Sequence, residues 1–162
     1  MKKYSIPEII SFVIDKAIGW VCIVFGMVMT ISTLIGILFR YVMTNPLPWT
    51  EELARYTMIW MGLLAISMGV KRETHLGLNL IVNLLPAWVQ TLLKMGSRVL
   101  IGVFLYILLV YGSKMAMNGV HQTMPALQIP MSFVLVAVPV SALVSLVQLV
   151  LITVIDVTGK GE

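Results

Sequence analysis

Charged residues are scarce in this sequence, and their scarcity limits the kind of protein that it can encode. Only 11% of the 162 residues are charged, whereas 59% are hydrophobic. A soluble domain carries roughly 25% charged residues. The mean hydropathy is +1.00. A water-soluble core of this size could not hide so much apolar surface, so we predict one membrane domain over residues 1–162 with lipid as its main solvent.

Residue types that hold metals and cofactors are also rare. The one cysteine, Cys22, lies in an apolar run and has no partner for an internal disulfide. His75 and His121 are the only histidines, and the topology predicted below puts them on opposite membrane faces, where they cannot share a haem. The sequence also contains no nucleophile–base set and no glycine-rich phosphate loop. We therefore expect no enzyme activity, no cofactor and no metal site.

Basic residues are present but do not cluster. No group of four or more stands together, which argues against a polybasic lipid-binding tail. The basic residues instead flank the apolar segments, so we attribute the net charge of +4 to membrane orientation rather than to nucleic-acid binding.

Four apolar segments have the length of transmembrane helices, for which about 20 apolar residues are needed. They cover roughly residues 17–40, 49–71, 92–114 and 131–156. We expect Pro139 to kink the last of them. The sequence thus predicts an all-α integral membrane protein with four transmembrane helices.

Two further segments are amphipathic. Residues 6–14 repeat isoleucine and valine at helical spacing, with Ser11 and Asp15 on the other face. This pattern fits either a helix on the membrane surface or an extension of the first span. Residues 76–93 are uncharged, but two asparagines share one face and a proline interrupts the run. We predict an interfacial helix at roughly 76–85, between the second and third spans, rather than a fifth span.

Lysine and arginine predict the orientation. With four spans, one side of the membrane holds Lys2, Lys3, Lys16, Lys71, Arg72, Lys94, Arg98 and Lys160. The other side holds only Arg40, Arg55 and Lys114. The positive-inside rule therefore places both termini in the cytoplasm.

The start of the second helix gathers several charges at the external face. We expect Thr50 to cap this helix and Glu51 and Glu52 to lie in its first turn, where the helix dipole favours anions. Arg55 follows Glu51 by four residues, so we expect these three charges to form one local ion-pair group. Arg40 closes the first helix.

Two interpretations of this stretch remain open. In one, the charges only cap helices, and Trp49 with Tyr56 belongs to an interfacial aromatic belt. In the other, the charges face a protein partner, because a charge at the centre of a spanning helix costs roughly 2.5–3.5 kcal/mol on insertion scales. Arg72 and His75 likewise either meet lipid headgroups or fix the interfacial helix. The apolar external loop with Pro125, Leu127 and Pro130 suggests a contact surface.

These segments resemble a known family in a fixed order. The resemblance rests on Arg40 and Tyr41, residues 45–56, Trp60, Arg72, His75, Leu85 and Pro86, residues 125–130 and Pro139. In these features the chain resembles the small membrane subunit (DctQ-like) of a tripartite ATP-independent periplasmic (TRAP) transporter. One departure is Asn79, where many relatives have an acidic residue.

The resemblance implies a scaffold subunit of a sodium-coupled importer in the bacterial inner membrane. Its partners would be a large TRAP membrane subunit, a periplasmic substrate-binding protein and membrane lipid. The substrate would be an organic acid such as a C4-dicarboxylate or sialic acid. Candidate interface or docking residues are Arg40, Trp49, Glu51, Glu52, Arg55, Tyr56, Trp60, Arg72, His75, Pro125, Leu127 and Pro130.

Two other classes of function are weaker alternatives. A self-sufficient proton-coupled multidrug exporter needs an acidic residue near the middle of a span, whereas Glu51 and Glu52 begin the second span. A tetraspan enzyme or electron-transfer subunit would need ligands or catalytic sets that the sequence does not contain.

Overall fold

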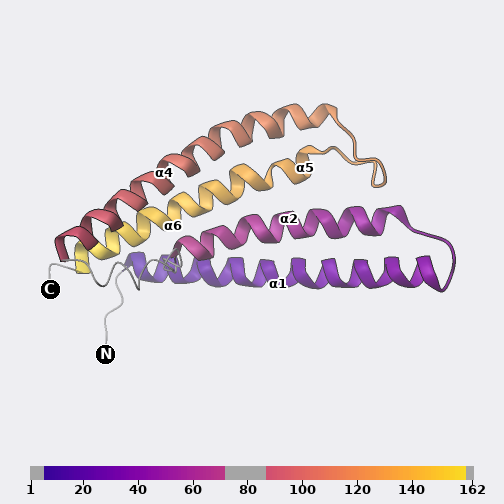
Figure 1. The fold of residues 1–162 in the computed structure, drawn as a ribbon, viewed down its shortest axis with the longest axis horizontal. Coiled ribbons are helices and arrows are strands. Elements are labelled where there is room, and N and C mark those ends of the chain that lie inside the picture. The colour runs from indigo at the N-terminus through magenta and orange to yellow at the C-terminus, as the bar shows by residue number, and fades with distance from the viewer. Residues whose placement is uncertain (1–5, 72–86, 160–162) are drawn as a thin grey trace.

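The computed structural model describes residues 6–71 and 87–159. Their helices are α1 (Ile6–Tyr41), α2 (Pro48–Lys71), α4 (Ala87–Asn118), the short 3-10 helix η2 (Gly119–His121), α5 (Ser132–Leu135) and α6 (Ala137–Gly159) (Figure 1). In this part of the chain, four stretches are long and apolar enough to cross a membrane: Ile6–Tyr41, Pro48–Lys71, Val89–His121 and Ser132–Asp156. The prediction of an all-α protein with four such helices is confirmed.

The first helix is longer than its apolar run. α1 is continuous from Ile6, so the amphipathic residues 6–14 extend the first span and do not form a separate helix. The interfacial helix expected at residues 76–85 lies outside the described residues, as do Arg72 and His75.

α2 begins with a proline, and the predicted cap at Thr50 is wrong. Pro48 is the first residue of the helix, where its fixed φ and missing N–H carry no penalty. The Thr50 hydroxyl donates to the carbonyl of Leu47 at 2.7 Å, so it does not accept a backbone N–H as a capping side chain would. Before the proline, Thr44 has φ 51°, and the N–H of Asn45 turns back to the carbonyl of Phe39 at 3.0 Å.

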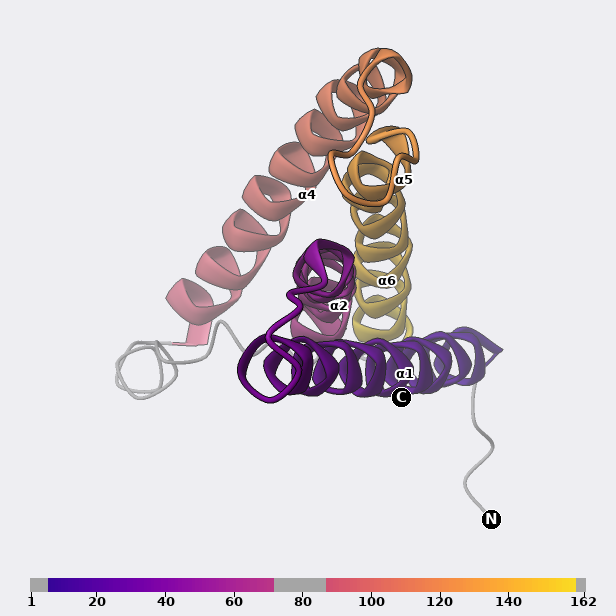
Figure 2. The same cartoon turned by 90° about the vertical axis from the view of Figure 1, so that its right-hand side faces the viewer.

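The ends of the long helices gather at two opposite ends of the molecule, which we call the loop end and the terminal end. The loop end carries the connections at 42–47 and 122–131, and the terminal end carries the start of α1 and the ends of α2 and α6 (Figure 1). α2 packs against α1 and α6, and α4 packs against α6. Viewed from the loop end, α1 lies obliquely beneath α2 and α6, and α4 crosses on the side away from α1 (Figure 2).

The kink expected at Pro139 appears as a break in the last span. The backbone hydrogen bonds stop with Val136 N–H donating to Ser132 and resume with Val140 N–H donating to Val136. Proline has no N–H and its ring clashes with the carbonyl four residues earlier. The indole N–H of Trp60 donates to the carbonyl of Phe133 at 3.1 Å, so a side chain of α2 satisfies a carbonyl beside the break.

A close approach between α4 and α6 depends on Gly112. A Cβ at this position would lie 2.8 Å from Cγ1 of Val138 and 3.3 Å from the backbone nitrogen of Pro139. We expect Gly112→Ala to destabilise the protein by about 1–2 kcal/mol, because the proline backbone cannot move aside. Thermal unfolding in detergent checks this. Gly96→Ala is the control, since its added Cβ meets nothing within 4 Å, and equal midpoints for the two variants would contradict the prediction.

Candidate partner-docking site at the loop end

Glu52 fastens α2 to the loop between α4 and α5. One carboxylate oxygen, Oε2, accepts the backbone N–H of Ala126 at 3.0 Å and that of Leu127 at 2.7 Å. The other oxygen, Oε1, accepts the hydroxyl of Tyr56 at 2.8 Å, one helical turn further along α2. A carboxylate that accepts three hydrogen bonds is a strong acceptor in a fixed position. Glu52 therefore holds the loop against α2 through these hydrogen bonds, and its side chain is only partly exposed.

The loop of residues 122–131 has a defined shape of its own. The N–H of Met131 donates to the carbonyl of Gln122 at 2.8 Å, and the N–H of Met124 donates to the carbonyl of Ile129 at 2.9 Å. These backbone hydrogen bonds join the beginning of the loop to its end. Gln128 sits at its tip with φ 55°. Met124 is only 1% exposed, so its buried side chain anchors the loop. The hydrogen bonds of Glu52 and the burial of Met124 hold this loop in one position.

Arg40 and Glu51 join the ends of α1 and α2 by an ion pair. Both side chains are about half exposed, and exposed pairs contribute about 0–1 kcal/mol to stability. The expected ion-pair group of Glu51, Glu52 and Arg55 is thus wrong for Glu51, which pairs with Arg40. Among residues 6–71 and 87–159, Arg55 makes no ion pair within 4 Å, and its side chain is exposed.

The other predicted docking residues lie at or near the same end, with different surroundings. Trp49 is exposed in the first turn of α2, and Pro125 is exposed in the loop. Pro130 forms an isolated bridge with Thr123. Trp60 lies deeper, with its ring centroid 6.0 Å from that of Phe25. Exposed polar and aromatic side chains at the loop end include Arg40, Tyr41, Trp49, Glu51, Arg55 and Gln128.

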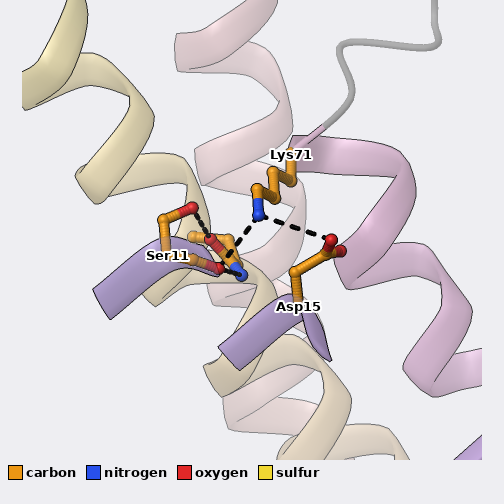
Figure 3. Close-up of polar contacts among 4 residues, drawn as sticks. Ser11, Asp15 and Lys71 are labelled. Atoms are coloured by element: carbon orange, nitrogen blue, oxygen red, sulfur yellow. Dashed lines mark hydrogen bonds and ion pairs between the residues drawn. The ribbon is translucent and has the colours of Figure 1, made fainter. Parts of the chain in front are cut away.

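A second polar cluster lies at the terminal end and joins α1, α2 and α6. The Lys71 ammonium lies 3.4 Å from the Asp15 carboxylate and donates to the carbonyl of Ser11 at 3.1 Å (Figure 3). Gln148 accepts the Ser11 hydroxyl at 2.8 Å and donates to the Ser11 carbonyl at 3.2 Å. Gln148 is fully buried, and Asp15 Oδ1 is buried without a hydrogen-bond partner among the described residues. This cluster fixes the first turns of α1 against two other helices.

Gln148 is not among the predicted site residues, although the sequence contains a signal for it. A glutamine within an apolar spanning run must find hydrogen-bond partners inside the protein. Ser11 and Asp15 lie on the polar face predicted for residues 6–14, and a polar face inside a membrane predicts polar partners on the other spans. Met124 gave no such signal, because a methionine in a loop is an ordinary residue.

The contacts of these side chains hold helices and a loop in position. The carboxylate of Glu52 is used in holding the loop, and that of Glu51 in pairing with Arg40. Within the described part of the chain, no three His, Cys, Asp or Glu side chains come close enough to hold a metal ion. The two polar clusters hold helices and a loop in place at opposite ends of the molecule.

Comparison with known proteins agrees with this arrangement. Residues 29–159 match the family model described as "Tripartite ATP-independent periplasmic transporters, DctQ component". The chain belongs to this DctQ family. The resemblance found in the sequence is confirmed, and the protein is a multi-pass inner-membrane component of a TRAP transporter. The family is described as a transporter component.

Three relatives illustrate the similarity of this DctQ-family chain. The C4-dicarboxylate TRAP transporter small permease protein DctQ of Vibrio cholerae is 33% identical over 64 residues, which are 40% of this chain and 28% of the relative. The sialic acid TRAP transporter permease protein SiaT of Haemophilus influenzae is 30% identical over 76 residues, which are 47% of this chain and 12% of the relative. The sialic acid TRAP transporter small permease protein SiaQ of Vibrio cholerae is 25% identical over 101 residues, 62% of this chain and 58% of the relative. Each match covers less than two thirds of the relative's own length.

Proposed function

We propose that this chain is the small, stationary subunit of a sodium-coupled organic-acid importer. In this proposal it binds a large membrane permease subunit and supports docking of a periplasmic substrate-binding protein. The observation that carries the proposal is the DctQ match over residues 29–159. The chain supplies anchoring contacts at both ends of its helices, which suits a scaffold that must keep its shape while another subunit moves.

The loop end is the surface that we assign to the periplasmic partner. The excess of lysine and arginine at the other end favours a cytoplasmic location for that end, with both termini inside. The loops 42–47 and 122–131 then face the periplasm. Glu52 holds one of these loops beside the Arg40–Glu51 pair, and together they offer a polar surface of stable shape.

The proposed substrate is a carboxylate. Relatives of this chain are named for C4-dicarboxylate and for sialic acid, and both molecules are organic acids. The two polar clusters of the described residues join helices and a loop to one another, so we place substrate and sodium recognition in the large subunit.

The test is reconstitution of the complete transporter in vesicles. We expect this chain to co-purify in equal amounts with the large permease subunit in mild detergent. Proteoliposomes that contain both subunits should take up radiolabelled C4-dicarboxylate or sialic acid when binding protein and a sodium gradient are supplied. Omitting this chain should abolish uptake. Recovery of the chain alone or only as a homodimer, or full uptake without it, would contradict the proposed function.

A further inference from the structure

Three buried side-chain oxygens have no hydrogen-bond partner among residues 6–71 and 87–159. They are Oδ1 of Asp15 on α1, Oγ of Ser67 on α2 and Oγ of Ser145 on α6, which we call the three inner oxygens. Ser67 and Ser145 are both 0% exposed. Buried polar groups in folded proteins are almost always paired with protein atoms or with ordered water, so each of these oxygens needs a partner.

The two serines differ from other hydroxyl residues in the spanning helices. Several hydroxyls donate to a carbonyl about one turn earlier in their own helix, namely those of Thr30, Thr33, Thr57, Ser113, Ser141 and Thr153. This bond is the usual way in which serine and threonine are satisfied within a helix. Ser67 and Ser145 do not make it, although α2 and α6 pack against each other and bury both side chains. Their hydroxyls are therefore available to a ligand between the helices.

The three inner oxygens stand next to the polar cluster at the terminal end. Each is one helical turn from a residue of that cluster in its own helix, the pairs being Asp15 and Ser11, Ser67 and Lys71, and Ser145 and Gln148. The carbonyl of Ser11 accepts hydrogen bonds from both Lys71 and Gln148, so the cluster residues lie together (Figure 3).

The three steps away from the cluster go in the same direction. α2 and α6 run toward the terminal end and α1 runs away from it (Figure 1), so each step leads one turn, about 5 Å, toward the loop end. Residues three or four apart lie on the same side of a helix. The three inner oxygens therefore converge in one layer just inside the cluster, which we call the inner polar layer.

The charges beside this layer favour a neutral ligand. The ammonium of Lys71 lies 3.4 Å from the other oxygen of Asp15, so the charge of the carboxylate is already balanced. A metal cation in the layer would add an uncompensated buried charge close to that ammonium, which is costly. The ligand must also donate to a carboxylate oxygen, which only accepts, and form hydrogen bonds with hydroxyls. Water is neutral and small, and it donates two hydrogen bonds and accepts two.

Water can reach the inner polar layer from the terminal end. Lys71 is the last residue of α2, and the side chains of Lys71 and Asp15 are 22% and 20% exposed. The layer lies one turn inside these partly exposed groups. Buried waters typically make about three hydrogen bonds to polar groups that have no other partner, and the layer offers three such groups.

We propose that the inner polar layer is the binding site of an ordered water molecule. The water donates to Oδ1 of Asp15 and forms hydrogen bonds with the hydroxyls of Ser67 and Ser145. It thereby joins α1, α2 and α6 one turn inside their direct polar contacts. This inference goes beyond the proposed function and does not depend on it, because it concerns contacts within this chain.

The variants Ser67→Ala and Ser145→Ala test the site through the sign of their effect. With the water bound, each alanine removes one of its hydrogen bonds and should lower the thermal unfolding midpoint of the chain in detergent by about 2–4 °C. Without the water, each alanine would remove a buried hydroxyl that has no partner, so the midpoint would stay the same or rise. Unchanged or raised midpoints in both variants would overturn the proposal.

Ser141→Ala is the matched control for these two variants. Ser141 is also buried on α6, but its hydroxyl donates to the carbonyl of Val138 at 2.9 Å. We expect a smaller shift in midpoint than from Ser145→Ala, since the hydroxyl of Ser141 returns to its own helix. A loss from Ser141→Ala as large as that from Ser145→Ala would contradict a specific role for the inner polar layer.

Two further measurements identify the ligand. A structure of the chain at a resolution that shows ordered water should contain a peak within about 3.2 Å of Oδ1 of Asp15 and of the serine hydroxyls, and a layer without that peak would overturn the proposal. The unfolding midpoint should be the same in sodium chloride and in choline chloride of equal ionic strength. A higher midpoint in sodium chloride for the unmodified chain but not for Ser145→Ala would show that the layer binds a cation, and this would overturn the assignment to water.

Discussion

Replacing Glu52 by alanine will release the loop of residues 122–131 from α2. The backbone N–H groups of Ala126 and Leu127 lose their shared acceptor, and the hydroxyl of Tyr56 loses its acceptor as well. We expect the backbone amides of this loop to exchange hydrogen with solvent about tenfold faster or more, because exchange reports local opening. Hydrogen–deuterium exchange of the peptide that covers residues 122–131 measures the effect. Uptake by the reconstituted transporter should fall in parallel if this loop supports docking.

Two further variants show whether the effect comes from the hydrogen bonds of Glu52. Glu51→Ala is the matched control, because Glu51 is next to Glu52 in the sequence but its carboxylate pairs with Arg40. It should leave exchange in residues 122–131 unchanged. Glu52→Gln should retain most of the protection, since an amide oxygen can still accept both N–H groups. Exchange in Glu52→Ala that equals exchange in the unmodified chain would show that Met124 alone holds the loop.

The positions of the spans could be predicted from the sequence because they depend on local composition. Runs of apolar residues between charges mark where lipid can surround a helix, and this rule located all four spanning stretches. The break in the last span was also predictable, since Pro139 removes a backbone donor wherever it lies in a helix. The point at which α1 begins could not be predicted from the sequence, because residues 6–14 are amphipathic. An amphipathic segment fits either a helix on the membrane surface or an extension of the first span that packs against other helices.

The partners of the charged residues could not be predicted in the same way. Local spacing pairs Arg55 with Glu51 and Glu52, but the described structure pairs Glu51 with Arg40 and Glu52 with two backbone amides. Those amides are more than 70 residues away in the chain, and nothing in the local sequence indicates that they come close. Tertiary packing decides between an exposed ion pair, which contributes little, and hydrogen bonds from amides to a carboxylate, which are stronger.

The cluster at the terminal end has a different energetic character from the loop end, and it should be more sensitive to substitution. The side chains of Lys71 and Asp15 are 22% and 20% exposed, compared with about half for the Arg40–Glu51 pair. Removing one partner of a buried ion pair costs about 3–5 kcal/mol, because the other charge stays buried without compensation. One oxygen of Asp15 already has no partner among the described residues, so the carboxylate depends on Lys71.

We therefore expect Lys71→Met to destabilise the isolated chain by about 2 kcal/mol, below the fully buried figure because water still reaches about a fifth of each side chain. Chemical or thermal unfolding in detergent measures the loss. The double variant Lys71→Met with Asp15→Leu should recover most of it, since an apolar pair leaves no buried charge. Lys16→Met is the control: Lys16 and Lys71 both lie about 6 Å from the ring centroid of Phe12, but in the described residues only Lys71 pairs with a carboxylate. A loss from Lys16→Met as large as that from Lys71→Met would mean that the contact with Phe12, and not the charge pair, fixes the first turns of α1.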